Sequence, residues 1–463
     1  MKDRISKYNI NVEYEGNVVL YNGLTGKLTV NSKEDYDIIQ SLLNDLDSFS
    51  VEYHKLYSEY KKAGFIINEE FDEYAFIKGQ NTRKVYMDRD YRLTINPTLD
   101  CNLKCWYCSV DYAGTKCPRE KMGDETFERL TKHVCNLIRS HMADSIVLDW
   151  FGGEPLMYYE NIIKPLSEHI FDQFPEMNIP FRQQITTNAT YLTKERIYEM
   201  KGYKFNLFQI TIDGNREHHN KIKFYSNRSG TYDDIIANVN LLADIIPDVV
   251  LILRINYDKQ TLTHICDVIN DLSEQAKRIV KVDFQRVWQV QMSDEDKCML
   301  EVCRTKFKEA GIECTYSAFR NNHFIHCYAD SIYHYVVNYD GKIFKCTARD
   351  YNDDISLGKL DINGNIEWND NVLNNYFLKR TFENGRCEQC KYLPFCMGPC
   401  IQKNYEARIE NRMVSCLLKD IDTNVNSWII NLAKKYNLLC VKGKIDFPQI
   451  GFEKGTTERG FQR

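Results

Sequence analysis

Residues 92–108 read RLTINPTLDCNLKCWYC, an apolar strand candidate that leads directly into three cysteines, Cys101, Cys105 and Cys108. A structural zinc ion takes four ligands in a closed tetrahedron, and a disulfide framework uses an even number of thiols. Thiolates favour zinc or iron–sulfur clusters, and the usual ferredoxin spacings differ from this one and supply a fourth cysteine. Three thiolates on one loop therefore indicate a metal site with one position left open for a ligand from outside the protein.

The strand in this stretch is the first of six apolar strand candidates that alternate with helical segments. Six βα repeats over about 220 residues predict an α/β fold with a parallel barrel or open barrel. In such folds the functional residues gather at the C-terminal ends of the strands. The strand candidates span residues 92–98, 145–151, 181–187, 205–212, 249–257 and 280–288, and the helical segments lie near 123–140, 157–172, 192–201, 232–246, 261–274 and 294–310.

Polar or glycine-rich clusters follow these strands at the point where each one ends. GGEP follows the second strand at 152–155, TTNAT the third at 186–190, and DGNREHHN the fourth at 213–220, while Arg254 lies near the end of the fifth. Each cluster alone is compatible with an ordinary turn. Because they arrive in phase with the strands, we expect one site at the mouth of the barrel.

The cysteine loop resembles the signature of the radical S-adenosylmethionine (SAM) enzymes, Cys-x3-Cys-x2-Cys with an aromatic residue, here Tyr107, before the last cysteine. The resemblance implies a [4Fe–4S] cluster on Cys101, Cys105 and Cys108 whose open iron chelates SAM. It also implies that one electron cleaves SAM to methionine and a 5′-deoxyadenosyl radical, which takes hydrogen from the substrate. The cofactor supplies the difficult chemistry, and the protein positions and shields it.

The strand-end clusters are similar to other segments of that family. GGEP looks like its glycine-rich strand end near the methionine amino group, and TTNAT like its Thr-Asn-Gly segment, with Ala189 in place of the glycine. TIDG at 211–214 resembles its Ser-x-Asp-Gly strand end near the ribose, with Thr211 in place of serine. For Asp213 and Arg254 the alternative is a strand-end salt bridge. The resemblance implies SAM contacts from Tyr107, Gly152, Gly153, Glu154, Thr187, Asn188, Thr211, Asp213 and Arg254.

A second set of cysteines resembles the SPASM extension of peptide-modifying radical SAM enzymes. Its spacing is Cys-x13-Gly-x4-Cys, then Cys-x2-Cys-x5-Cys-x3-Cys, then a final cysteine. The resemblance implies two auxiliary [4Fe–4S] clusters, three clusters in all. The fourth ligand of the inner cluster stays open, with Cys314 the nearest upstream candidate, and a zinc ribbon is the alternative for the Cys-x2-Cys pair. The implied ligands are Cys387, Cys390, Cys396 and Cys416 for the outer cluster, and Cys327, Cys346 and Cys400 for the inner one.

Composition limits the compartment and the partners. The chain has 463 residues, enough for two or three domains, and 60 basic against 65 acidic side chains, a net charge of −5 that makes no case for nucleic acid or an anionic membrane. The sequence has no run of 18 apolar residues and no signal-peptide core at its start. We therefore expect a cytoplasmic protein, in which the 17 cysteines are not disulfides.

The N-terminal region predicts a small domain of its own. Residues 8–30 alternate as strands, Ser32 is a candidate N-cap for a helix with an apolar stripe, and a second helix near 51–62 ends at Gly64 before a short strand. This resembles the winged-helix recognition element of peptide maturases, which binds a leader peptide by adding it as a strand to a sheet edge. The alternative is a cap that binds nothing.

Together these features predict a partial (β/α)6 TIM-like radical SAM barrel between a winged-helix-like α+β domain and a loop-rich SPASM iron–sulfur domain. The expected function is maturation of a ribosomally synthesised precursor peptide by a thioether, carbon–carbon or carbon–oxygen crosslink, with electrons from an external flavodoxin or ferredoxin. The expected domains are 1–82 for peptide recognition, 88–310 for the barrel, 311–440 for the SPASM domain with its closing helix, and 441–463 for a polar tail.

Two alternative functions stay open. One is anaerobic sulfatase maturation, which forms formylglycine, because DGNREHHN resembles a motif of that branch with His219 aligned. Asn220 and Lys223 depart from its Asp and Arg, and Thr347 stands where that branch has an Asp, its expected general base; the nearby Asp350 is interpreted as a solvated loop residue. The other is a catalytically silent metal-binding scaffold.

Overall fold

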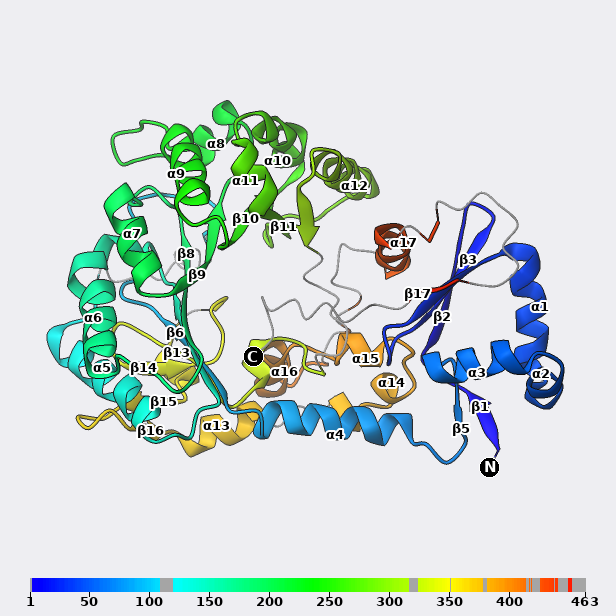
Figure 1. Ribbon diagram of the computed structural model, residues 1–463. Coiled ribbons are helices and arrows are strands. Elements are labelled where there is room, and N and C mark those ends of the chain that lie inside the picture. The colour runs from blue at the N-terminus through cyan, green and yellow to red at the C-terminus, as the bar shows by residue number, and fades with distance from the viewer. Residues whose placement is uncertain are drawn as a thin grey trace. The chain divides into compact units, whose positions relative to one another are not determined.

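The chain is described by a computed structural model and divides into two compact units (Figure 1). The first unit comprises Met1–Met87, Tyr316–Ser331 and Leu378–Arg463, and the second comprises Asp88–Thr315 and Ile332–Phe377. The structure describes residues 2–108, 120–315, 324–349, 351–377, 381–413, 416, 418, 425–436, 438–439 and 449–451.

The second unit is built on a sheet whose central strands are the six predicted ones. They pair in parallel and lie side by side in chain order, which confirms the predicted α/β barrel architecture. None of their described side chains is fully exposed: β7 is buried almost throughout, whereas buried and half-buried positions alternate along β10. These strands are β6 (Asp90–Ile95), β7 (Ser145–Trp150), β8 (Phe181–Thr187), β9 (Phe205–Thr211), β10 (Val250–Tyr257) and β11 (Val280–Arg286).

Helices line the outer side of this curved sheet (Figure 1). In α5, Leu130, Val134 and Ile138 repeat every four residues and are buried, which is the apolar stripe that docks a helix on a sheet. The helix predicted at 157–172 begins instead as a 3-10 turn and a π turn, and the one at 261–274 ends in a 3-10 turn. The α-helices are α5 (Asp124–Arg139), α6 (Lys164–Gln173), α7 (Lys194–Gly202), α8 (Arg216–Ile222), α9 (Tyr232–Ile245), α10 (Lys259–His264), α11 (Glu274–Ile279) and α12 (Asp294–Glu309).

The barrel sheet continues past the boundary expected at residue 310. Strand β12 (Glu313–Thr315) extends one edge, and β13 (His334–Val337) pairs in parallel with β6 at the other. Three short antiparallel strands follow it, and 332–377 therefore lies in the same compact unit as the barrel. This differs from the expected 311–440 domain, because strands of three or four residues carry too little periodicity to be read from sequence. The remaining elements are β14 (Lys342–Phe344), β15 (Gly358–Leu360), β16 (Ile366–Trp368) and α13 (Asp370–Phe377).

The first unit contains the N-terminal sheet and its helices. The Ser32 hydroxyl accepts the Asp35 N–H at 3.0 Å and caps α1, and Gly64 ends α3 with φ +87°, both as predicted. The single helix expected near 51–62 is two helices, α2 and α3. The elements are β1 (Asp3–Ile5), β2 (Asn9–Tyr14), β3 (Asn17–Asn22), β4 (Leu28–Ser32), α1 (Lys33–Asn44), α2 (Leu46–Glu52), α3 (His54–Ala63), β5 (Ile66–Asn68) and α4 (Glu73–Tyr86).

The two faces of strands β2–β4 pack against different parts of the chain. Val18 and Leu20 face the core formed with α1–α3. Val19 and Tyr21 face the other way and pack with Phe395 and with Trp428 of α17 (Val425–Lys435). A fourth strand from far along the chain, β17 (Gln449–Gly451), pairs antiparallel with β4. Residues expected in two separate domains therefore share one core, and β17 of the expected tail joins the same sheet. The other helices of this unit are α14 (Gly385–Glu388), α15 (Leu393–Cys396) and α16 (Ile401–Ile409).

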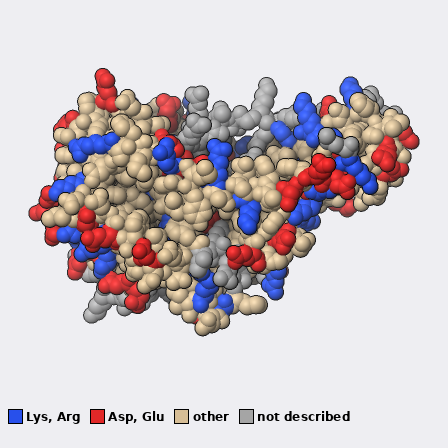
Figure 2. Space-filling view, turned by 90° about the horizontal axis from the view of Figure 1, so that it is seen from below, with Lys and Arg blue, Asp and Glu red and all other residues tan. Residues whose placement is uncertain are grey.

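The surface carries charges of both signs. Figure 2 shows Lys and Arg interspersed with Asp and Glu over the face it displays. Within the described residues, no helix combines the length and the apolar character that crossing a membrane requires.

Candidate functional site

The three-cysteine loop follows β6 in the second unit. Cys101, Cys105 and Cys108 are half-buried, and burial raises the pKa of the Cys105 thiol to about 12, while Lys223 opposes that shift. Cys105 and Cys108 line a pocket of about 420 Å³ together with Lys104, Trp106 and other residues of the loop and α8. Metal coordination deprotonates thiols outright. Two of the three sulfur donors of this loop open on the pocket, and the set of three fits a cluster that keeps one iron free.

The GGEP loop after β7 comes into backbone contact with the cysteine loop. Gly153 N–H donates to Thr98 O at 3.1 Å, and Glu154 N–H donates to Asp100 O at 2.9 Å. A Cβ atom at Gly153 would lie 2.0 Å from Asp100 O, and one at Gly152 would lie 2.2 Å from Thr98 O. Both positions therefore require glycine, and Gly152 also has φ +112°.

Glu154 joins the ends of β7 and β8. Its side chain is fully buried and accepts hydrogen bonds from Thr187 Oγ1 at 2.7 Å, Asn188 N at 2.7 Å and Leu156 N at 3.0 Å. Burial raises its pKa to about 7, and the three hydrogen bonds limit that rise. The carboxylate therefore holds the TTNAT segment in place, and its expected contact with the SAM amino group stays a prediction.

The TTNAT segment after β8 also forms side-chain hydrogen bonds to the cysteine loop. Asn188 Nδ2 donates to Asn102 Oδ1 at 2.8 Å, and Asn102 Nδ2 donates to Thr190 Oγ1 at 2.9 Å. Asn188 Nδ2 also lies 3.8 Å from Cys101 Sγ. Ala189, which replaces the glycine of the family, has φ +64°, a left-handed conformation that glycine adopts without strain.

The end of β9 holds the loop through Tyr107. Its hydroxyl donates to Asp213 Oδ2, and Asn256 Nδ2 donates to the same hydroxyl at 3.3 Å. Lys223 Nζ lies 3.0 Å from Asp213 Oδ2, and both side chains are almost fully buried. The salt bridge considered for Asp213 thus exists, but its cation is Lys223. Arg254 instead donates to Asn256 Oδ1 at 3.2 Å.

Two further expected residues have defined positions. Thr211 ends β9 and pairs in register with Arg254 on β10. His219 is fully buried: its Nδ1 accepts Asp213 N–H at 3.1 Å, and its Nε2 lies 3.1 Å from Thr231 Oγ1. Burial lowers the pKa of His219 well below its usual value, with Lys223 adding to the shift, so a neutral ring holds the β9 turn.

Sequence reasoning missed Asn102, Asn256 and helix α8, and it treated Lys223 only as a departure from a family motif. Asn256 lies two residues after Arg254, on the same face of β10, so strand alternation was a usable signal. Asn215, which caps α8 by accepting the His218 N–H at 3.1 Å, was a second signal.

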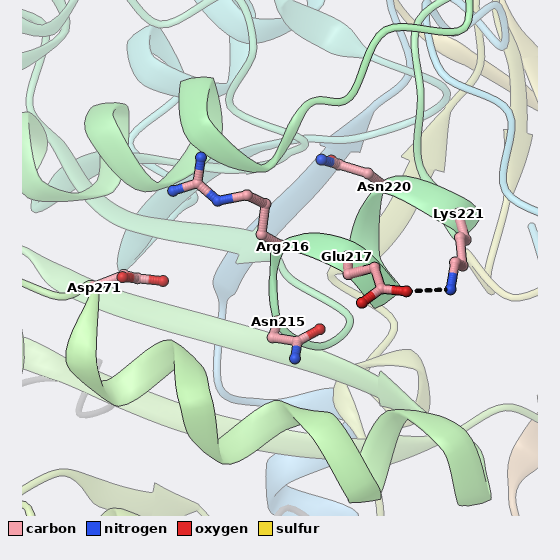
Figure 3. Close-up of a pocket in the computed structure, with 6 residues that line it drawn as sticks. All are labelled: Asn215, Arg216, Glu217, Asn220, Lys221 and Asp271. Carbon is pink, nitrogen blue, oxygen red and sulfur yellow. Dashed lines mark hydrogen bonds and ion pairs between the residues drawn. The ribbon is translucent and has the colours of Figure 1, made fainter.

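A second surface pocket, of about 610 Å³, lies elsewhere on α8. Figure 3 shows Arg216, Glu217 and Lys221 of this helix beside it, with the Glu217–Lys221 ion pair of 2.7 Å as a dashed line. Its other lining residues are Asn215, Asn220 and Asp271. It contains no residue expected to contact SAM, so its size alone does not mark the site.

The second cysteine set falls partly around one cavity of the first unit. Cys387, Cys390, Cys396 and Cys416 line that cavity, together with Leu393 and Pro399 among others. The pKa of Cys396 is raised to about 12, mainly by burial and to a smaller extent by the neighbouring thiols, while a backbone hydrogen bond limits the rise. The structure therefore brings together the four residues expected at the outer auxiliary cluster. No three described His, Cys, Asp or Glu side chains converge on a single-ion site.

The three cysteines expected at the inner auxiliary cluster are divided between the two compact units. Cys327 and Cys400 belong to the first unit, whereas Cys346 follows β14 in the second. Cys314 Sγ lies 3.8 Å from Arg304 O in the barrel unit. Cys135 and Cys303 are buried, whereas Cys298 is exposed. Asp350 lies outside the described residues, as do Cys117 and Cys440.

Comparisons with known proteins identify the family of the barrel region. Residues 95–272 match the radical SAM superfamily. The cysteine-type anaerobic sulfatase-maturating enzyme of Clostridium novyi (strain NT) is 21% identical over an alignment of 341 residues, which covers 67% of this chain and 87% of that enzyme.

Two solved structures share the fold at low identity. Native anSMEcpe with bound AdoMet has a TM-score of 0.51 at 18% identity and covers 74% of this chain and 99% of its own. Streptococcus suis SuiB bound to precursor peptide SuiA has a TM-score of 0.50 at 14% identity and covers 87% of this chain and 96% of its own. The second likeness thus extends over more of this chain than the first.

Proposed function

Residues 95–272 form a domain of the radical SAM superfamily, and from this premise we propose that the protein is a maturase of a ribosomally synthesised peptide. Radical SAM enzymes use SAM and a [4Fe–4S] cluster, and Cys101, Cys105 and Cys108 are the residues that would hold that cluster here. When both are bound, SAM and the cluster would supply a 5′-deoxyadenosyl radical able to take a hydrogen atom from an unactivated carbon. The chain is thus an enzyme related to sulfatase and peptide maturases.

The chain's own residues hold the loop and bind SAM. Strand ends β7, β8 and β9 each tie down the cysteine loop through Glu154, Asn188 and Asp213, which keeps the thiolates in one geometry. Gly152 and Gly153 let the β7 turn approach closely enough for backbone groups to bind the amino acid part of SAM. In this proposal Thr187 and Asn188 also contact SAM, Thr211 contacts the ribose with Asp213, and Arg254 pairs with the carboxylate.

The observation that carries the peptide proposal is the N-terminal sheet. Its β4 edge already accepts an extended segment, since Gln449, Ile450 and Gly451 pair antiparallel with Val30, Thr29 and Leu28. An edge that pairs with one strand through main-chain hydrogen bonds can pair with the leader of a precursor peptide in the same way once the leader displaces β17. The longer coverage of the SuiB fold, 87% against 74% of this chain, supports a recognition domain beyond the barrel.

Two auxiliary clusters are part of the proposal. Cys387, Cys390, Cys396 and Cys416 surround a cavity suited to one of them, and Cys327, Cys346 and Cys400 would bind the other. A crosslink removes two hydrogens from the peptide, and abstraction accounts for one of them. The second leaves as a proton and an electron, so a nearby electron acceptor is needed, while an external flavodoxin or ferredoxin supplies the first electron. We place this chemistry in the cytosol, where thiols stay reduced.

Sulfatase maturation is the second candidate, favoured by the likeness to the Clostridium novyi enzyme and to anSMEcpe. It converts one residue to formylglycine and needs a base next to that residue. Thr347 cannot serve as that base at neutral pH. The likeness to that branch also leaves out about a quarter of this chain.

One experiment separates these candidates. Full-length protein reconstituted without oxygen is incubated with SAM, dithionite and two kinds of peptide. The first kind is any short Cys- or aromatic-bearing peptide found in a reading frame that neighbours the gene, and the second is a Cys-x-Pro-x-Arg sulfatase peptide. We expect 5′-deoxyadenosine in both reactions and a mass lower by two hydrogen atoms in the first peptide only. Formylglycine in the second peptide would reverse the assignment, and absence of SAM cleavage with either would reject an enzyme.

A further inference from the structure

Lys223 is a buried cation beside the cysteine loop, outside the set of residues expected to contact SAM. We propose that Lys223 is a positioning residue, which acts through Asp213 and Tyr107 to fix the part of the loop that carries Cys105 and Cys108. The inference rests on the radical SAM assignment and not on the identity of the peptide.

The contacts form one continuous chain from α8 to the cysteine loop. Lys223 Nζ lies 3.0 Å from Asp213 Oδ2, and the hydroxyl of Tyr107 donates to the same oxygen. The ammonium also lies 5.9 Å from the centre of the Tyr107 ring. Because Tyr107 directly precedes Cys108 and follows Cys105 by two residues, the position of its ring limits where both thiolates lie.

Lys223 is itself held firmly. Its N–H donates to His219 O at 2.7 Å at the end of α8, and Thr231 Oγ1 donates to its carbonyl at 3.1 Å. Its side chain is 3% exposed and that of Asp213 is 0% exposed. A buried carboxylate without a counter-charge is costly, so the ammonium is what allows Asp213 to stay here as a strong acceptor for Tyr107. Lys223 therefore contributes a charge that Asp213 requires, in addition to its packing.

The barrel contains a second group of the same chemistry, which serves as a matched control. Tyr159, also buried, donates its hydroxyl to Glu199 Oε2 at 3.0 Å, and Lys164 Nζ lies 2.6 Å from Glu199 Oε1. This tyrosine–carboxylate–lysine group joins the π turn at Tyr159–Ile163 and the start of α6 to α7. None of these hydrogen bonds or ion pairs involves a cysteine of the loop. Substitutions in this group therefore report a loss of overall stability that does not arise from the cysteine loop.

The test uses anaerobically reconstituted full-length protein without any peptide. SAM cleavage under dithionite and the electron paramagnetic resonance spectrum of the reduced cluster, with and without SAM, are measured for Lys223→Met, Tyr107→Phe and the double variant. We expect cleavage to fall about tenfold in Lys223→Met and about fivefold in Tyr107→Phe, with less than about twofold further loss in the double variant. The SAM-induced spectral change should weaken in all three, and Lys223→Arg should restore most of the cleavage because it keeps the charge.

The controls are Lys164→Met and Tyr159→Phe, which should stay within about twofold of the unmodified protein. Tyr107→Phe removes one hydroxyl only, so it keeps the test informative if Lys223→Met does not fold. Unchanged cleavage and spectrum in Tyr107→Phe, multiplying losses in the double variant, or equal losses in the controls would each overturn the proposal. Such a failure leaves the peptide proposal untouched, because no peptide is present.

Discussion

The two cysteine sites are held in place by different forces. The loop at 101–108 is tied by polar contacts from three strand ends, and its thiols open on a pocket of about 420 Å³. The cavity lined by Cys387, Cys390, Cys396 and Cys416 lies in a region of short helices whose apolar residues, such as Leu393 and Phe395, pack into the cores of the first unit. A site that must admit a ligand needs a rigid polar frame, whereas a site enclosed by its own ligands can rely on packing.

Removal of one thiol at each site should have the largest effect and should separate the two roles. Cys105→Ala should abolish SAM cleavage, because the cluster loses one of its three protein ligands. Cys390→Ala should lose the iron of an auxiliary cluster but keep peptide-independent SAM cleavage within about threefold. Iron content and 5′-deoxyadenosine formation measure the two outcomes.

Cys135→Ala is the matched control for that pair, since this buried cysteine of α5 only packs. It should keep its full iron content and cost about 1 kcal/mol of unfolding free energy. Loss of SAM cleavage in Cys390→Ala, equal to that in Cys105→Ala, would contradict the division of labour.

Gly153→Ala tests the rigid frame of the first site. The new Cβ would lie 2.0 Å from the backbone oxygen of Asp100, so the β7 turn and the cysteine loop must move apart. We expect a loss of about 3 kcal/mol in unfolding free energy and weaker SAM binding, measured by urea unfolding and calorimetry. Gly79→Ala in α4, where no heavy atom lies within 4 Å, should instead gain about 0.5–1 kcal/mol. Equal stability of both variants would show that the contact is not tight.

Glu154→Gln tests the ionisation of the Glu154 carboxyl by the pH dependence of the unfolding free energy. The folded pKa of Glu154 is about 7, above its ordinary value of 4.5, so the folded state holds the proton more tightly than the unfolded state. Its stabilising contribution is present below the ordinary value and is lost as pH rises through about 7. The stability advantage of the unmodified metal-free protein over Glu154→Gln should therefore shrink by about 3 kcal/mol between about pH 5 and about pH 8.

Glu199→Gln gives the opposite sign in the same urea-unfolding series. Burial would raise the pKa of Glu199, but hydrogen bonds from Lys164 and Tyr159 outweigh it and lower that pKa. The advantage of the unmodified protein over this variant should be lost as pH falls. A parallel pH dependence for both variants would refute the assigned difference between the two carboxylates.

Ala189→Gly should have the smallest effect. Relief of the left-handed conformation at φ +64° is opposed by the loss of a buried methyl group, so the net change should stay under about 1 kcal/mol. SAM cleavage should not change. Ala189→Val, which is β-branched, should destabilise by about 2 kcal/mol or more in the same unfolding experiment, and a tolerated valine would mean that the segment relaxes.

Much of the barrel was predictable because its signals are local. The six central strands are long apolar runs, and Ser32 and Gly64 mark helix ends by chemistry that acts within a few residues. Strands β13 to β16 were not predictable, because each is three or four residues long and is stabilised by a partner distant in sequence. Helix α8 was hidden by its polar composition, although Asn215 marks its start.

The candidate site divides in the same way. Sequence by itself determined the spacing of the cysteines and the phase of the polar clusters with the strands, since covalent distance and side-chain periodicity are written along the chain. Only the tertiary structure decided that Asp213 pairs with Lys223 and Tyr107, that Glu154 serves Thr187 and Asn188, and that the N-terminal sheet shares its core with Phe395 and Trp428. Those outcomes depend on burial and on contacts between segments far apart in sequence, which no local pattern encodes.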